Sequence, residues 1–255
     1  MTNPDLVRAT AFMALTLLLS WPLWLGVIAG KIALTPFGSF APGVAALAMA
    51  ALFDGREGLR GIGARFARWR VRPAAYVLAL LGAPLLVTVA LTLAPRGQVD
   101  ASKLLLWPVA YLEVLLFTAV GEETGWRGYL LPLLLRRFSA LRASIVVGLF
   151  WAVWHLPLFS IRGTPQSEVP FGYFSVNLMA LSVLFTALFR WTGGSLWPPL
   201  LLHASVDTSL AIAGLAFPGS TASRRFWLAY FWLTIAVAIV VSLFGRKARF
   251  ESSRA

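Results

Sequence analysis

Eight long apolar runs divide this sequence, and they limit its possible folds more than any other feature. Most are close to the ~20 residues that an α-helix needs to cross the ~30 Å hydrocarbon core of a bilayer. We therefore expect an all-α, polytopic membrane protein with about eight transmembrane helices. Because no internal repeat or low-complexity linker is visible, residues 1–255 are predicted to form a single transmembrane domain. The runs cover residues 9–29, 39–53, 74–94, 104–122, 143–160, 171–189, 195–215 and 226–244.

The composition agrees with a lipid environment. Hydrophobic residues make up 59% of the chain and charged residues 13%, whereas soluble domains carry about 25% charged residues. The absence of cysteine excludes disulfides, cysteine-ligated zinc and a thiol nucleophile. The net charge of +12 does not indicate nucleic acid, because the basic residues lie between apolar runs. The positive-inside rule, with contact to anionic lipid, accounts for it.

The distribution of basic residues predicts the orientation. With the N-terminus inside, 16 of the 22 Lys and Arg residues fall on the inner side and six, including Arg162, on the outer side. Both termini are therefore predicted to be cytoplasmic, in a multi-pass protein of the plasma (inner) membrane. The basic segment 55–72 suits a helix lying on the inner leaflet with Trp69 at headgroup level. A solvated loop is the alternative for this segment.

Several ionisable residues lie where a membrane span should exclude them. The chain has only ten acids and two histidines, and each ionisable group within a span costs about 2.5–3.5 kcal/mol on insertion. Such groups usually face the protein interior and mark a site or a pathway. The residues in or at the ends of the apolar runs are Glu113, Glu122, Glu123, His155, His203 and Asp207.

The densest polar cluster is GEETGWRGYLLP, at residues 121–132. Adjacent helical carboxylates point about 100° apart, so Glu122 and Glu123 are expected to do different jobs. Glu123 and Arg127 are four residues apart and can pair on one helical face. That pairing would fix Glu123 and leave Glu122 freer to act as a base. A charge cluster that simply ends a helix is the alternative.

Both histidines lie in otherwise apolar helical segments. His155 occurs in FWAVWHLPLF, where a lone histidine is often only a hydrogen-bonded core residue. Pro157 cannot donate a backbone hydrogen bond and is expected to loosen this helix. His203 and Asp207 have the i, i+4 spacing that places both on one face. The carboxylate could orient the imidazole or share a metal ion with it, or the two could form a structural pair between helices.

Together, these residues resemble the CPBP family, which comprises the CAAX proteases and bacteriocin-processing enzymes and is also called the Abi family. Residues 122–127 look like its EExxxR motif. His155 matches the histidine of its second motif, and His203 with Asp207 matches its HxxxN/D motif. The order of the motifs and their placement in three separate spans also match. The catalytic core is expected at about residues 104–215.

The resemblance implies hydrolysis of a peptide bond within the membrane, as in type II CAAX prenyl endopeptidases. Glu122 with His155 could activate a water molecule, and His203 with Asp207 could stabilise the oxyanion. The family is also described as metallo-dependent, so a zinc ion with an open position for water is the alternative to a site without a cofactor. The catalytic residues implied are Glu122, Glu123, Arg127, His155, His203 and Asp207, and the metal ligands implied are Glu122, His155, His203 and Asp207.

Two positions depart from the family pattern. The second motif usually has Phe four residues before its histidine, where this chain has Trp151. The last motif often ends in Asn, where this chain has Asp207. A free carboxylate would repel developing negative charge, so Asp207 would have to be protonated or act by orienting His203.

Two other classes of function use the same residues. An ion-coupled transporter would employ the buried acids, although no repeated halves are visible. A non-catalytic membrane partner, such as an immunity protein, would keep the fold alone. For the peptidase, the expected partners are the lipid bilayer and a membrane-embedded or lipidated peptide or protein.

Overall fold

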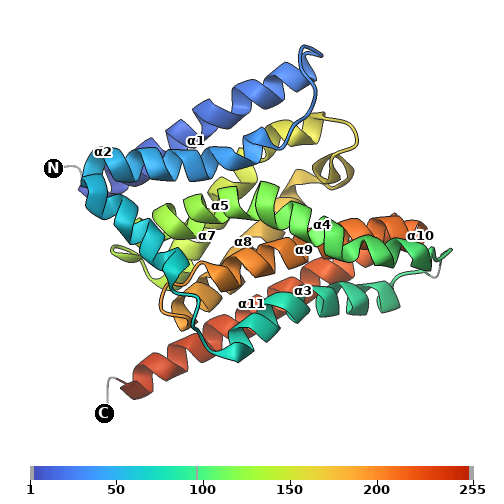
Figure 1. Ribbon diagram of the computed structural model, residues 1–255. Coiled ribbons are helices and arrows are strands. Elements are labelled where there is room, and N and C mark those ends of the chain that lie inside the picture. Colours follow the sequence, from blue (N-terminus) through green and yellow to red (C-terminus); the bar gives the residue numbers. More distant parts are fainter. Residues whose placement is uncertain (1–2, 96, 253–255) are drawn as a thin grey trace.

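The computed structural model describes residues 3–95 and 97–252 as a bundle of helices (Figure 1). Within these residues, eight helical segments are long and apolar enough to cross a membrane. The all-α polytopic fold predicted from the apolar runs is thus confirmed. Six spans are α1 (Pro4–Ile28), α2 (Phe37–Ala67), α3 (Pro73–Leu93), α8 (Phe171–Trp191), α9 (Trp197–Ala216) and α11 (Arg224–Ser252), with the short α10 (Pro218–Thr221) between the last two.

The fourth span is much longer than the sequence predicts. It runs over Ala101–Leu135, whereas the apolar run ends near residue 122. From hydropathy alone, Glu122, Glu123 and Arg127 indicate the end of a span. In the folded protein all three side chains are buried and the helical span continues past them. The span consists of the 3-10 turn η1 (Ala101–Leu106), α4 (Trp107–Val114), η2 (Leu115–Ala119), α5 (Val120–Gly125), η3 (Trp126–Leu130) and α6 (Leu131–Leu135).

The acidic pair lies between two π-helical turns. The segments η2 and η3 are both π-helical and flank α5. Widened turns of this kind occur often at functional sites. Gly121 and Gly125 let α5 approach α2 closely, because a Cβ atom on either would overlap the backbone of Ser39 or Pro42. This small-xxx-small spacing brings the two helices together at the level of the acids.

Two other spans are irregular. Helix α2 bends at Gly55, whose φ of 57° is left-handed, and its basic second part stays helical to Ala67. The predicted helix within residues 55–72 is therefore present, although residues 68–72 are not helical. The fifth span consists of α7 (Ala140–Trp154) followed by the 3-10 turn η4 (Leu156–Ser160). The break falls at His155, beside Pro157, as expected from the missing N–H of proline.

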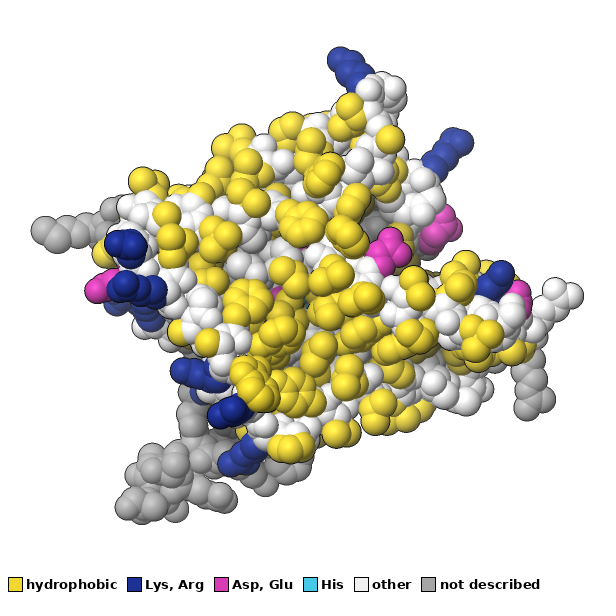
Figure 2. Space-filling view, viewed as in Figure 1, with side chains coloured by type: hydrophobic (Ala, Val, Ile, Leu, Met, Phe, Trp, Pro, Cys, Tyr) yellow, Lys and Arg dark blue, Asp and Glu magenta, His cyan; other side chains and the backbone are white. Residues whose placement is uncertain are grey.

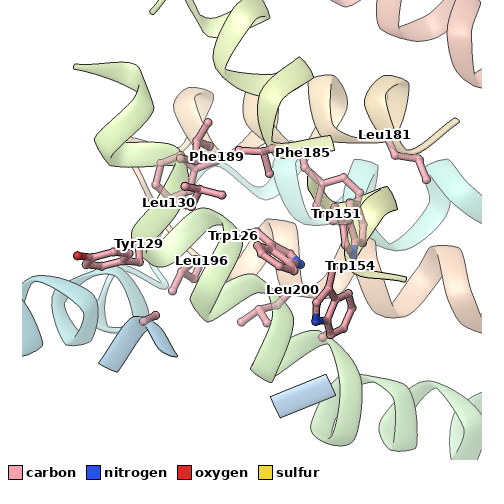
Figure 3. Packing of buried hydrophobic residues seen from close by; sticks show 14 of the residues in the cluster. Trp126, Tyr129, Leu130, Trp151, Trp154, Leu181, Phe185, Phe189, Leu196 and Leu200 are labelled. Carbon is pink, nitrogen blue, oxygen red and sulfur yellow. The ribbon is translucent and has the colours of Figure 1, made fainter. Parts of the chain in front are cut away.

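The helices pack so that α5 lies in the interior of the bundle (Figure 1). Helix α2 packs against α5, α8 against α7 and α11, and α9 against α3. A cluster of large aromatic side chains occupies the centre, including Trp126, Trp151, Trp154 and Phe185 (Figure 3). The face shown in Figure 2 is largely apolar between its charged ends, and leucines such as Leu18 and Leu105 are 70% and 80% exposed. That pattern fits contact with lipid tails.

The charged residues gather at the ends of the bundle. The start of α1, the bend in α2 and the end of α11 lie at the same end, on the left of Figure 1. Lys and Arg side chains cluster at that end in Figure 2. The basic residues beyond position 243 lie outside the side chains that the structure describes.

Candidate active site

A buried ion pair anchors the site on the fourth span. Arg127 NH1 donates to Glu123 Oε1 at 2.8 Å, and both side chains are completely buried. This confirms the i, i+4 pairing predicted from the sequence. The same Glu123 oxygen lies 2.9 Å from Nδ1 of His203 on α9. One carboxylate oxygen therefore links the two helices, a contact that sequence spacing could not predict.

Aromatic rings enclose the arginine of this pair. Its guanidinium carbon lies 5.1 Å from the ring centre of Trp151 and 4.4 Å from that of Phe185. Cation–π contacts of this kind stabilise a cation that has lost its water. Among the described residues, however, Arg127 Nε and NH2 and Glu123 Oε2 have no hydrogen-bond partner. The ion pair is thus held in a largely apolar environment.

Glu122 is anchored by two indole groups. Its Oε2 accepts a hydrogen bond from Trp151 Nε1 at 2.6 Å and another from Trp126 Nε1 at 3.2 Å. The side chain is only 2% exposed. Because indole N–H groups are donors only, Oε2 serves as the acceptor and Oε1 is left for another partner. The expectation that Glu122 is the freer member of the pair therefore holds for one of its oxygens only.

Trp151 is the residue that sequence reasoning undervalued. The sequence presents it as an aromatic replacement, but its N–H contacts Glu122, which phenylalanine could not do. Its ring centre also lies 6.1 Å from that of His155 and 5.3 Å from that of His203. The presence of Trp151 where the family usually has Phe was the one sign in the sequence that this residue is special. The sequence could not show that its indole N–H donates to Glu122, because that contact depends on how the spans pack.

His155 lies at the broken end of α7, with its ring 8% exposed. Its Nδ1 is 2.8 Å from the carbonyl oxygen of Trp151. A carbonyl only accepts, so Nδ1 carries the proton and Nε2 is available as an acceptor in the neutral ring. The ring packs edge-on against Trp154 and Phe174. These contacts fix the tautomer and the orientation that a proton-accepting histidine needs.

Asp207 forms the open side of the cluster. Its Oδ2 lies 3.5 Å from His203 Nε2, and its side chain is 44% exposed, whereas that of His203 is 2% exposed. The predicted i, i+4 juxtaposition is therefore confirmed, at a distance longer than a good hydrogen bond. Glu113, the other acid within the apolar runs, is exposed on α4 and outside these contacts.

Two comparisons with known proteins find similarity to this chain. Residues 104–209 match the family model of the Rce1-like type II CAAX prenyl endopeptidases. The CAAX prenyl protease 2 of Methanococcus maripaludis is 45% identical over 62 residues. Residues 104–209 are CAAX protease-like. This confirms the resemblance drawn from the motifs.

The similarity to the curated relative is local. It covers 24% of this chain and 22% of the length of the Methanococcus protein. The segment matched by the family model contains Glu122, Glu123, Arg127, His155, His203 and Asp207. All candidate residues of the site thus belong to the CAAX protease-like core.

The predicted zinc ligands do not form a metal-binding group as they are arranged. Among the described residues, no three His, Asp or Glu side chains lie together as a metal ion requires. In the CAAX protease-like core, both ring nitrogens of His203 face carboxylates. Nδ1 of His155 faces a carbonyl and Oε2 of Glu122 holds two indoles. These contacts occupy both ring nitrogens of His203 and one donor atom each of His155 and Glu122, and the zinc site stays a prediction.

Proposed function

We propose that this chain is an intramembrane endopeptidase that hydrolyses a peptide bond of a lipidated, membrane-associated protein. The observation that supports it most is the convergence of Glu122, His155 and His203, from three spans, around the ring of Trp151. Buried ionisable groups that converge inside a membrane protein are expensive and are kept for function. The local match to CAAX prenyl proteases supports both the hydrolytic reaction and a prenylated substrate.

The chemistry follows from the free positions of the three side chains. Oε1 of Glu122 takes a proton from a water molecule as it attacks the scissile carbonyl, since Oε2 is held by the two indoles. His155 offers Nε2 to the same water. His203 lies between the carboxylates of Glu123 and Asp207, so it acts as an imidazolium with a proton on each ring nitrogen. Its Nδ1–H donates to Glu123, and its Nε2–H donates to the developing oxyanion.

Cleavage in liposomes tests this function. The purified protein is reconstituted with a farnesylated peptide that ends in a CAAX sequence, and with the same peptide lacking the farnesyl group. Mass spectrometry should detect removal of the last three residues from the prenylated peptide, with little product from the other. A wild-type protein that cleaves neither peptide but conducts ions in the same liposomes would favour the transporter instead.

Loss of the Trp151 indole donor is expected to slow hydrolysis. Trp151→Phe keeps an aromatic ring beside Arg127 but removes the N–H that holds Glu122. A hydrogen bond to a charged group is worth about 1.5–3 kcal/mol, so kcat should fall about tenfold or more while KM changes little. Steady-state kinetics on the prenylated peptide measure both constants.

A matched indole elsewhere provides the control. Trp197 Nε1 donates to the carbonyl of Phe66 at 2.7 Å, near one end of the bundle. Trp197→Phe removes a comparable hydrogen bond without touching Glu122, so its kcat should stay near that of the wild type. Equal losses of kcat in the two variants would show that Trp151 acts through general stability and not through Glu122.

Replacement of Asp207 by asparagine distinguishes the two roles proposed for this residue. The amide keeps the shape of the side chain and supplies a permanent donor beside His203 Nε2. If Asp207 supports oxyanion stabilisation, activity should be retained within about tenfold, since the substitution removes at most one hydrogen bond. Full loss of activity, with stoichiometric zinc in the wild type and none in Asp207→Asn, would establish the metal role instead.

Both termini are proposed to face the cytoplasm, with the protein in the plasma (inner) membrane. The 16-to-6 division of basic residues supports this orientation. Reporter fusions at the C-terminus and in the segment near Arg162, which lies between η4 and α8, should give opposite locations. The same location from both fusions would contradict the eight-span topology.

A further inference from the structure

Two arginines of the basic segment converge on the loop between α8 and α9. Gly193 and Gly194 in this loop have left-handed φ angles of 63° and 87°. The point that a Cβ atom would occupy on Gly194 lies 3.1 Å from Arg65 NH1 and 3.5 Å from Arg68 NH1. A side chain at position 194 would press against the end of Arg65, so glycine at this position lets both guanidinium groups come close to the loop.

The loop and the end of α2 are fixed to each other. The backbone N–H of Leu196 donates to the carbonyl of Arg65 at 3.2 Å, and Trp197 Nε1 donates to the carbonyl of Phe66 at 2.7 Å. The Arg65 guanidinium also lies over the ring of Phe189, 5.5 Å from its centre. The convergence of the two arginines is thus built into the packing of α2 against α8 and α9.

The cluster has no balancing acid among the described residues. One terminal nitrogen of Arg65 and one of Arg68 both lie close to the Cβ position of Gly194, so these two nitrogens are less than about 7 Å apart. Like charges at this separation repel each other. Arg136, by contrast, has a carboxylate partner in Asp5, which it shares with Arg137. No such pair is formed by Arg65 or Arg68 in the described part of the chain, and Arg65 Nε is buried without a hydrogen-bond partner.

The cluster lies where lipid headgroups are expected. Trp69, one residue after Arg68, is 56% exposed, and the Arg70 guanidinium lies 4.8 Å from its ring centre. Tryptophan with arginine is typical of the membrane–water interface. The end of the molecule where Lys and Arg gather borders the apolar surface in Figure 2. At the headgroup level of a bilayer, the phosphate groups of anionic lipids are the nearest source of an anion.

We propose that Arg65 and Arg68, held against residues 192–196, bind the phosphate of an anionic membrane lipid. Arginine suits this task because its planar group offers two parallel N–H donors to phosphate oxygens. A bound anion between the two guanidinium groups would offset the repulsion between their like charges. The site is separate from Glu122 and His155 and does not depend on the proposed peptidase activity.

Native mass spectrometry of the purified full-length protein tests the site. The protein is mixed with equal amounts of phosphatidylglycerol and phosphatidylcholine, and the retained lipids are counted. Wild type should prefer phosphatidylglycerol, and Arg65→Gln with Arg68→Gln should lower its apparent affinity at least about tenfold. The matched control is Arg56→Gln with Arg60→Gln, which removes the same charge from exposed positions of α2 and should keep the preference.

Each of the following results would overturn the proposal. Equal losses in the two double variants would indicate general surface charge, and full retention by the Arg65/Arg68 variant would place the lipid elsewhere. Displacement of phosphatidylglycerol by excess inorganic phosphate, with equal thermal protection by phosphate alone, would indicate a site for the free ion.

If the double variant does not fold, the single variant Arg68→Gln replaces it, because Arg68 is exposed. This variant should still weaken phosphatidylglycerol binding, and an unchanged affinity would also contradict the site.

Discussion

Replacement of Glu122 by glutamine is expected to lower the rate of peptide hydrolysis by about 10²–10⁴, the usual contribution of a general base. Glutamine keeps an oxygen that can accept from the indoles of Trp126 and Trp151, so the local packing should survive. What the variant loses is the basic Oε1 that would accept a proton from water. The rate is measured with the prenylated peptide in liposomes, and folding is measured as the melting temperature.

A second acid in the same span provides the matched control. Glu113 lies in α4 and is exposed, outside the contacts that join the site. Glu113→Gln makes the same chemical change in the same span and should leave turnover close to that of the wild type. Near-normal turnover by Glu122→Gln, or an equal loss in both variants, would remove Glu122 from its proposed role as the base.

The number of spans could be predicted because each apolar run is an independent signal of bilayer-crossing length. The end of the fourth span could not be predicted from hydropathy, which treats a charged residue as exposed. Glu123 and Arg127 neutralise each other inside the bundle, so the helix continues for two further turns. The bend in α2 is likewise a property of one left-handed residue, Gly55, which the sequence does not distinguish from other glycines.

The site shows the same division between local and tertiary information. Pairs four residues apart, such as Glu123 with Arg127 and His203 with Asp207, follow from helical geometry and were predicted. The link from Glu123 to His203 spans 80 residues, and the bond from Trp151 to Glu122 spans 29. Such contacts depend on how the spans pack, so spacing along one helix carries no information about them.

Replacement of Glu123 by alanine is expected to destabilise the protein by about 3–5 kcal/mol, because it leaves a buried charge without its partner. Arg127 is completely buried, and Glu123 is the carboxylate with which it pairs. The substitution also removes the acceptor that holds Nδ1 of His203, so activity should fall together with stability. Glu122→Ala removes only an acceptor from two indoles and should cost less, about 1–3 kcal/mol.

A double variant distinguishes two effects of Glu123→Ala: the unpaired charge left on Arg127 and the lost contact with His203. Met in place of Arg127 fills a similar volume between Trp151 and Phe185 without a charge, so Glu123→Ala with Arg127→Met should be more stable than Glu123→Ala alone. A buried ion pair replaced by apolar groups is often neutral in stability. Activity should not recover with stability, because His203 still lacks its acceptor. Unfolding measured in mixed micelles gives the free energies, and equal destabilisation by Glu123→Ala and Glu122→Ala would contradict the different roles assigned to the two acids.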